Sequence, residues 1–164
     1  MFVLRRVGGL CFLVIEYIEG TQFSLKGIMG LNKINHIGIA VEDLAQSIEV
    51  YKLLTGRGPH HCEEIKTDQV KTAFFKVQET NLELLQATSP ESPIAKFIKK
   101  QGRGGIHHIC IEVDDLEAKL TELKNAGVTL IDKRPRQGAH DMLVAFVHPK
   151  SMGGVLIELA QHKI

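Results

Sequence analysis

Residues 36–48 read HIGIAVEDLAQSI, and residues 108–120 read HICIEVDDLEAKL. The two stretches align without a gap at an offset of 72 residues, and a histidine, two isoleucines, a valine, an aspartate and a leucine are identical in register. An internal period fixes the architecture, because each copy folds as the same unit and packs against the other. Chance matches an apolar strand easily, but it rarely matches the histidine, the acidic pair and the following helical pattern together. The sequence therefore predicts a duplicated module.

Each copy predicts a strand followed by a helix. β-branched residues at 37, 39 and 41, and again at 109, 111 and 113, alternate with small or polar residues, so the histidine of each copy lies on the opposite face. Apolar residues then recur at helical spacing in both copies. We expect these helices to be capped at their starts by Asp43 with Gln46 and by Asp114 with Glu117, and to stop at Gly56 and Gly127.

Strand-like runs follow each predicted helix. They cover residues 71–77 and 81–87 in the first copy and 128–131, 143–147 and 154–160 in the second, with a short linking helix over 92–100. We interpret each half as βαβββ and mostly antiparallel, with only two of the three later strands of the first copy located. The predicted fold class is α+β: two βαβββ modules pair into one curved mixed sheet around a metal site, with the helices outside. Small residues on the histidine-bearing faces leave room for a pocket, namely Gly38, Ala40 and Cys110.

The domain prediction separates an N-terminal extension from one duplicated domain. Residues 1–31 are expected to be poorly ordered, and residues 32–164 to form a single domain with modules at about 32–90 and 104–162. Arg5 and Arg6 before an apolar stretch resemble the start of a signal peptide, but Glu16 follows with no small-residue cleavage site. We favour a plain extension, or upstream sequence before a start at Met29, over a targeting segment.

Composition excludes several classes of protein. Twenty basic residues against nineteen acidic ones give a formal charge of +1, which is no electrostatic footprint for a nucleic acid. Three cysteines without a CxxC pair argue against a disulfide framework or a cysteine zinc site. No apolar run reaches the length of about 20 residues that a membrane span needs. We therefore expect no nucleic-acid partner and no membrane.

A metal site is the chemistry that the duplication predicts. Each half ends in a strand with a glutamate flanked by apolar residues, Glu83 in LELL and Glu158 in IELA. A carboxylate in such a run is costly to bury unless it is paired or coordinated. With His36 and His108, the two halves supply the same pair of groups. Two imidazoles and two carboxylates suit Co²⁺, Mn²⁺, Ni²⁺, Zn²⁺ or Fe²⁺.

Plainer interpretations compete for every histidine. A lone strand histidine is more often a hydrogen-bonded core residue than a ligand, and only the duplication favours ligands at 36 and 108. We expect His107 to point away from His108, and the pair His60 and His61 to lie in a turn after Gly58-Pro59. His162 belongs to the tail. Two others are candidates for the pocket mouth, His140 and His148.

The sequence resembles the vicinal-oxygen-chelate (glyoxalase-like) superfamily and, within it, the methylmalonyl-CoA epimerase family. The resemblance covers about residues 32–162, and its most specific parts are SPESPIAKF and HPKSMGGVLIEL. It implies metal ligands at His36, Glu83, His108 and Glu158. It also implies an isomerase that interconverts (2R)- and (2S)-methylmalonyl-CoA by removing the C2 proton, through an enolate that the metal stabilises. Glu158 is the catalytic acid/base that the resemblance points to.

One position departs from the family pattern. The second carboxylate of the family falls on Thr72 in the strand VKTA, and a threonine cannot act as that acid. Glu83, Lys71 or a bound water remain candidates for the second proton donor. Lys99, Lys100 and Arg103 are candidates for the phosphates of coenzyme A, although such a cluster is more often a solvated face.

Other functions stay open at this point. A glyoxalase I-like isomerase or an Fe(II) extradiol dioxygenase uses the same scaffold, and two histidines with one glutamate match the facial triad of iron oxygenases. A non-catalytic binding or resistance protein would be expected to lack ligands, and a purely structural domain would leave the duplicated pairs unexplained. The resemblance further implies a CoA thioester substrate, a homodimer, and a cytoplasmic location, or the mitochondrial matrix in a eukaryote.

Overall fold

The computed structural model describes residues 3–7, 10–14 and 31–163. Its main body contains eight strands, three α-helices and two short 3-10 helices. In chain order the strands and α-helices are β3 (Leu31–Ala40), α1 (Leu44–Thr55), β4 (His61–Ile65), β5 (Val70–Val77), β6 (Thr80–Ala87), α2 (Pro93–Gln101), β7 (Gly105–Val113), α3 (Leu116–Asn125), β8 (Arg136–Gln137), β9 (Met142–Val147) and β10 (Ile157–His162). The 3-10 helices are η1 (Ala139–Asp141) and η2 (Pro149–Ser151).

Two further strands precede this body. β1 (Val3–Val7) and β2 (Leu10–Val14) pair antiparallel as a separate two-stranded sheet. Both lie within the expected N-terminal extension, and residues 15–30 of that extension lie outside the described residues. The extension and its poor order therefore stay a prediction.

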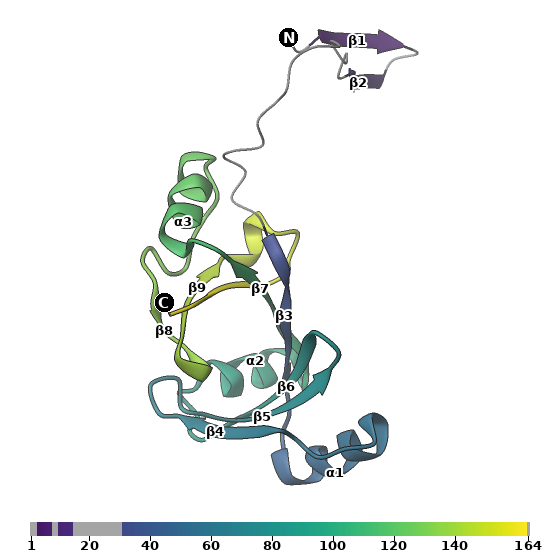
Figure 1. Ribbon diagram of the computed structural model, residues 1–164, viewed down its shortest axis with the longest axis vertical. Coiled ribbons are helices and arrows are strands. Elements are labelled where there is room, and N and C mark those ends of the chain that lie inside the picture. The colour runs from purple at the N-terminus through teal and green to yellow at the C-terminus, as the bar shows by residue number, and fades with distance from the viewer. Residues whose placement is uncertain (1–2, 8–9, 15–30, 164) are drawn as a thin grey trace.

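The eight strands form one curled mixed sheet, as the sequence predicted. Their order is β4-β5-β6-β3-β7-β10-β9-β8, so the first strands of the two modules, β3 and β7, lie together at the centre and pair antiparallel. β6 joins β3 in parallel on one side, and β10 joins β7 in parallel on the other. Figure 1 looks into the resulting half-barrel. The repeat thus places each βαβββ module on its own half of the sheet.

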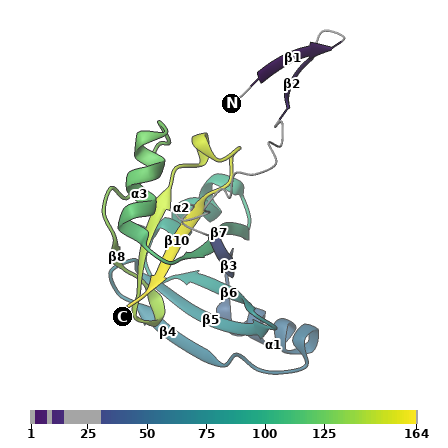
Figure 2. The same cartoon turned by 45° about the horizontal axis from the view of Figure 1, so that its top comes forward.

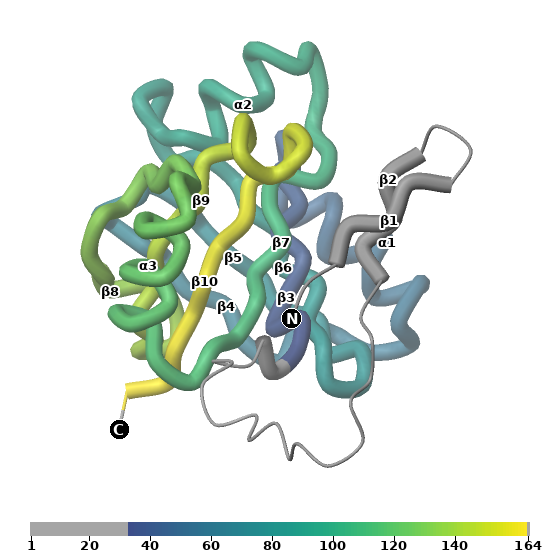
Figure 3. The backbone as a smooth tube through the Cα atoms, turned by 90° about the horizontal axis from the view of Figure 1, so that it is seen from above, coloured from purple at the N-terminus to yellow at the C-terminus, as the bar shows by residue number. Residues whose placement is uncertain are grey.

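Helices α1 and α3 cover the outer face of this sheet. Under α1, Phe75 and Leu84 are fully buried between the helix and strands β5 and β6. Leu116 of α3 and Val147 of β9 are buried in the same way where α3 packs on β9 and β10. The third helix, α2, lies across the ends of β3, β6 and β7 (Figure 3). Two of the apolar clusters therefore lie on the outside of the curl, while the inner face carries buried polar groups beside other apolar residues such as Val144 and Ala160.

The predicted caps hold in one module and shift by one residue in the other. Asp43 accepts a hydrogen bond from the Gln46 amide at 2.9 Å, and α1 ends at Gly56 with a φ of 70°. The N-cap of α3 is Asp115 rather than Asp114, and it accepts from the Ala118 amide at 3.0 Å. Asp115 is the residue that matches Asp43 in the repeat, so the duplication places this cap better than local spacing does.

Two strand predictions in the second module were wrong in extent. Residues 128–131 make only an isolated bridge, Leu130 to Val147, because the Asp132 carboxylate takes the Phe146 amide and ends the ladder. The next strand to pair with β9 is instead β8. β10 begins at Ile157 rather than at 154, since Gly153 and Gly154 turn the chain with positive φ. In the first module, β4 is a strand that the sequence analysis did not predict.

Candidate metal centre and cavity

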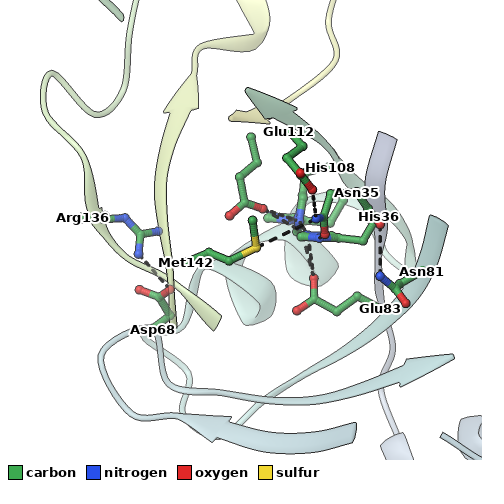
Figure 4. A network of polar contacts seen from close by, with 11 residues as sticks. Asn35, His36, Asp68, Asn81, Glu83, His108, Glu112, Arg136 and Met142 are labelled. Atoms are coloured by element: carbon green, nitrogen blue, oxygen red, sulfur yellow. Dashed lines mark hydrogen bonds and ion pairs between the residues drawn. The ribbon is translucent and has the colours of Figure 1, made fainter. Parts of the chain in front are cut away.

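The four expected ligands come from four adjacent strands at the centre of the sheet. Glu83 lies on β6, His36 on β3, His108 on β7 and Glu158 on β10. All four are buried, with exposed fractions between 3% and 7%. Figure 4 shows the two histidines and Glu83 pointing toward one another from their strands. The structure therefore brings together the two histidines that the repeat paired 72 positions apart and the matching glutamate of each module.

Their side-chain atoms meet around one point. His36 Nε2 lies 3.0 Å from His108 Nε2, and 3.2 Å from Glu83 Oε2 and from Glu158 Oε2. His108 Nε2 lies 3.0 Å from Glu158 Oε2 and 3.6 Å from Glu83 Oε2. Metal–ligand bonds of about 2.1 Å place neighbouring ligand atoms about 3 Å apart. The spacing therefore fits a divalent metal at the common point.

The donor set also fits a metal chemically. Two imidazole nitrogens facing each other at 3.0 Å between two buried carboxylates make a poor hydrogen-bonding arrangement, because one proton at most fits between the nitrogens. A divalent cation uses both lone pairs and compensates both carboxylates. His36, His108 and Glu158 place one ligand atom each within 4.8 Å of one another, and Glu83 contacts both nitrogens from its own strand.

A second pair of side chains orients the two histidines, and the sequence analysis missed it. His36 Nδ1 lies 3.0 Å from Asn35 Oδ1, and His108 Nδ1 lies 2.9 Å from His107 Nδ1. A proton on the Nδ1 of each ligand histidine, donated to these acceptors, leaves each Nε2 free to bind metal. Asn35 is held in turn by donating to Glu112 Oε2 at 2.9 Å. Positions 35 and 107 share the repeat offset, which is the signal that would have found them.

The expectation that His107 points away from His108 was wrong. The register between β3 and β7 shifts between Gly38 and Ile39, because Gly38 pairs with His108 and Ile39 with Ile106. This bulge leaves His107 unpaired and lets its ring reach the same cavity as its neighbour. Burial, followed by the nearby His108, lowers the pKa of His107 to about 4. Its ring is therefore neutral at pH 7, and a neutral imidazole can accept the proton of His108.

The two glutamates differ in pKa although they are equally buried. Burial raises the pKa of Glu83, and the neighbouring histidines only partly offset this. Burial acts in the same direction on Glu158, but hydrogen bonds from His108 and His36 outweigh it and hold its pKa well below the usual range. The Glu158 carboxyl is thus more readily ionised than the Glu83 carboxyl. One ionised carboxylate, fixed by two imidazoles, is the group best prepared to interact with a cation.

Gly38 makes the close packing of the site possible. A Cβ built on Gly38 would lie 2.2 Å from His108 Cε1, far inside contact distance. The sequence analysis expected Gly38, Ala40 and Cys110 to leave an open pocket. Instead the His108 ring fills the space over Gly38, while Ala40 and Cys110 are fully packed within apolar clusters.

The pocket itself lies beside the ligands on the inner face of the curl. It is a cavity of about 260 Å³ with largely apolar walls, bounded by α2 at one end and by the β8–β9 region at the other. All four ligand residues line it. The remaining side chains include Val70, Phe74, Leu85, Ile94, His107, Arg136, His140, Met142, Val144 and Phe146. An apolar cavity with a few convergent polar groups is typical of a small-molecule site.

The other residues considered as contacts for the substrate or as proton donors differ in whether they reach the cavity. His140 lines the cavity, as expected, whereas His148 is exposed and caps η2 by accepting from the Lys150 amide. Lys71 is on the exposed face of β5, so it points away from the ligands and is no candidate proton donor. Thr72 faces inward between two cavity-lining residues and is 1% exposed. Lys99, Lys100 and Arg103 are exposed.

His61 is not in a turn. It begins β4, and it points to the same side as Glu63 and as the cavity-lining Ile65. The turn prediction failed because the inward positions of β4 carry polar groups, which conceal the alternation that marks a strand.

The fold and this constellation of ligands define a protein superfamily. Residues 35–146 match the description "Glyoxalase/Bleomycin resistance protein/Dioxygenase superfamily", and the chain belongs to this superfamily.

Within the superfamily, several of the similar proteins are methylmalonyl-CoA epimerases, as the motifs implied. The chain is 42% identical over 135 residues to a mitochondrial methylmalonyl-CoA epimerase of Dictyostelium discoideum, covering 82% of this chain and 81% of that protein. An ethylmalonyl-CoA/methylmalonyl-CoA epimerase of Cereibacter sphaeroides is 38% identical, with coverage of 80% and 98%. A solved methylmalonyl-CoA epimerase in complex with methylmalonyl-CoA and NH4+ superposes with a TM-score of 0.77 at 32% identity, covering 81% and 96%. The expectation of an isomerase is confirmed by these relatives.

Among the described residues, no helix is both long enough and apolar enough to cross a membrane.

Proposed function

We propose that this chain epimerises methylmalonyl-CoA at C2, using a divalent metal held by His36, Glu83, His108 and Glu158. The observation that carries the proposal is the convergence of these four side chains at 3.0 to 3.6 Å beside an apolar cavity. The relatives support the substrate, because those reported above are methylmalonyl-CoA epimerases and one is solved with that thioester.

The reaction needs charge stabilisation and a proton transfer. C2 lies between a thioester and a carboxylate, so removing its proton gives an enolate, and a bound divalent metal supplies the Lewis acidity that stabilises such a charge. The residues of the chain orient the ligands and shield the reacting carbon. Asn35 and His107 fix the two ligand rings, and the cavity walls exclude water from the carbanion.

Glu158 is the group that we assign to one face of C2. Its carboxylate is buried, borders the cavity, and is ionised because two imidazoles hydrogen-bond to it. A carboxylate has two oxygens, so one can face the metal position while the other faces the substrate. Glu158 therefore acts as a base that removes the C2 proton and as an acid that returns it.

The test is exchange of the C2 hydrogen of methylmalonyl-CoA in D₂O, followed by NMR with and without Co²⁺. We expect metal-dependent exchange in the wild type and its loss in Glu158→Gln and His108→Ala. His148→Asn is the matched control, because its side chain is exposed away from the cavity and asparagine can also cap η2. Absence of exchange with any divalent metal would refute the proposal.

An extradiol dioxygenase is the second candidate, because His36, His108 and Glu158 also form a two-histidine, one-carboxylate triad. An oxygenase requires Fe²⁺ and consumes O₂, whereas an epimerase works anaerobically with Co²⁺. Oxygen uptake with a catechol and Fe²⁺, together with no anaerobic exchange, would favour the dioxygenase. The homodimer and the cytoplasmic or mitochondrial location remain predictions.

A further inference from the structure

A second cluster of polar side chains borders the cavity, and the metal centre does not use it. His61 and Glu63 come from β4 in the first module, and His140 comes from η1 in the second. His140 itself lines the cavity. Glu63 is the middle one of the three inward-facing residues of β4, between His61 and Ile65. The cluster is thus assembled from both modules at the wall formed by β4 and β5.

Glu63 holds the cluster together. Its Oε1 accepts a hydrogen bond from the His140 backbone amide at 3.2 Å, lies 3.3 Å from His61 Nε2, and lies 4.0 Å from His140 Nε2. The rings of His61 and His140 have centroids 4.2 Å apart. One carboxylate therefore fixes both the backbone and the ring environment of His140.

The backbone at His140 is unusual in a way that points to function. His140 and Asp141 have φ of 51° and 55°, so two consecutive non-glycine residues are left-handed. Such conformations are costly and persist where surrounding contacts impose them, commonly at functional sites. Here the imposed turn directs the His140 ring against Phe74, edge to face, at a centroid distance of 4.3 Å.

Phe74 separates this cluster from the metal centre. Its ring contacts His140 on one side and lies 6.1 Å from the His36 ring on the other. A proton passing between His140 and C2 of a substrate held at the ligands therefore travels past the edge of the Phe74 ring, through one bridging water. Glu158 belongs to β10, which lies on the other side of the central β3–β7 pair from β4 and β5. His140 also belongs to the second module, but its ring packs against Phe74 and His61 of the first, so the His140 ring and Glu158 border the cavity at different walls.

Thr72 supplies an independent observation at the same wall. It is the register partner of Glu63, it is 1% exposed, and its Oγ1 lacks a hydrogen-bond partner within the described part of the chain. Buried polar groups are normally paired, so an unpaired hydroxyl facing inward beside Glu63 indicates a ligand or water contact. Packing alone does not explain it.

We propose that His140, positioned by Glu63, is the second proton-transfer residue, serving the face of C2 opposite to the one that Glu158 serves. This inference rests on the epimerase function proposed above. Burial, followed by the charge of His61, lowers the pKa of His140, so its imidazole is available as a base at neutral pH. Its side chain is 34% exposed, which allows it to exchange protons with solvent.

The proton balance is complete with these two groups. In one direction the C2–H bond breaks, its electron pair stays on the carbon skeleton as the enolate, and the proton passes to the Glu158 carboxylate. His140, whose neutral ring has taken up a proton from solvent at its exposed side, then gives that proton to the opposite face of C2 and becomes neutral again. The reverse direction exchanges the roles, and solvent resets both groups.

The experiment starts from each epimer separately in D₂O with Co²⁺ and follows two signals. NMR reports exchange at C2, and circular dichroism reports inversion. In His140→Asn, which keeps a residue tolerant of positive φ, we expect inversion to fall by about a hundredfold or more in both directions. Exchange from the epimer whose hydrogen faces Glu158 should fall much less than inversion. Co²⁺ binding, followed by its visible absorption, should be unchanged.

Two further variants separate catalysis from structure. In His140→Gly, added imidazole should restore part of the inversion rate, which a purely structural role would not allow. In Glu63→Gln, the amide oxygen can still accept from the His140 backbone, so kcat should fall while KM stays near the wild-type value. His148→Asn again serves as the control.

The outcomes distinguish this inference from the proposed function. Wild-type exchange combined with normal inversion in His140→Asn would overturn the role of His140 and leave the epimerase function intact. No exchange in the wild type would overturn both. A second equivalent of Co²⁺ that His140→Asn abolishes would assign the cluster to a second metal instead, and would also overturn the proton-transfer role.

Discussion

The two modules supply equivalent ligands but differ at their edge strands. In the first module, β4 places Glu63 opposite Thr72, and in the second, β8 places Arg136 opposite Val144. Each edge strand is tied to the other module. Glu63 accepts from the His140 amide, and Arg136 Nη1 lies 3.2 Å from Asp68 Oδ2, as Figure 4 also shows. The two edges of the sheet therefore approach each other and narrow the curl (Figure 2).

The difference between the edge strands explains how two equivalent modules form a cavity with unequal walls. The central strands repeat His36 as His108 and Glu83 as Glu158, which suits a metal on a two-fold axis. The edges break the symmetry, because one wall of the cavity carries a histidine cluster and the other carries an arginine. The two sides of the cavity therefore carry different polar groups.

The largest expected effect tests whether the two modules contribute equally to the metal centre. His36→Ala and His108→Ala should each weaken Co²⁺ binding by more than about a hundredfold, because each removes a direct ligand. Calorimetric titration measures both, with His162→Ala, an exposed histidine, as the control. Wild-type affinity in either variant would show that the modules do not contribute equally.

The next test compares positions 38 and 110, which match in the repeat. Gly38→Ala forces a Cβ to within 2.2 Å of His108 Cε1, so it should destabilise the protein by about 1–3 kcal/mol and weaken metal binding. Cys110→Ala removes a buried sulfur and should cost about 1 kcal/mol without displacing a ligand. Urea unfolding and Co²⁺ titration measure the two effects. Equal metal affinity in both variants would contradict this explanation.

A smaller effect is expected at the residues that orient the ligand rings. Asn35→Ala and His107→Ala remove the acceptors for His36 and His108, and each should weaken metal binding by about 10- to 100-fold. Asn35→Asp keeps an acceptor and should retain most of the affinity. If His107→Ala bound metal normally, the second module would orient its histidine by the bulge alone.

The smallest effect on stability is expected at the ion pair that links the two edges of the sheet. Arg136→Gln and Asp68→Asn break an ion pair whose partners are about one-third exposed, so each should cost at most about 1 kcal/mol. A double-mutant cycle by thermal unfolding gives the coupling between them. A coupling well above that value would mean that the cross-module contact contributes to stability as a buried pair does.

The central strands were predictable from the sequence, and the edges were not. The repeat identified β3, β7 and their ligands because identical residues recur at one offset. β4 was missed because His61 and Glu63 occupy its inward positions in place of apolar residues. The orientation of His107 depended on a bulge that arises only when β3 and β7 pair. The strand expected at 128–131 ended because a side chain, Asp132, replaced the backbone acceptor.

The order of the strands along the chain also has a consequence for how the metal centre forms during synthesis. The partners of β3 are β6 and β7, and the fourth ligand, Glu158, lies on β10, which follows the other strands of this sheet in the chain. A nascent chain that ends before β10 carries three of the four ligands and exposes the edge of β7. Long-range pairing of this kind forms late and leaves unpaired strands exposed until it does. We therefore expect the complete set of four ligands to form only after β10 has been synthesised.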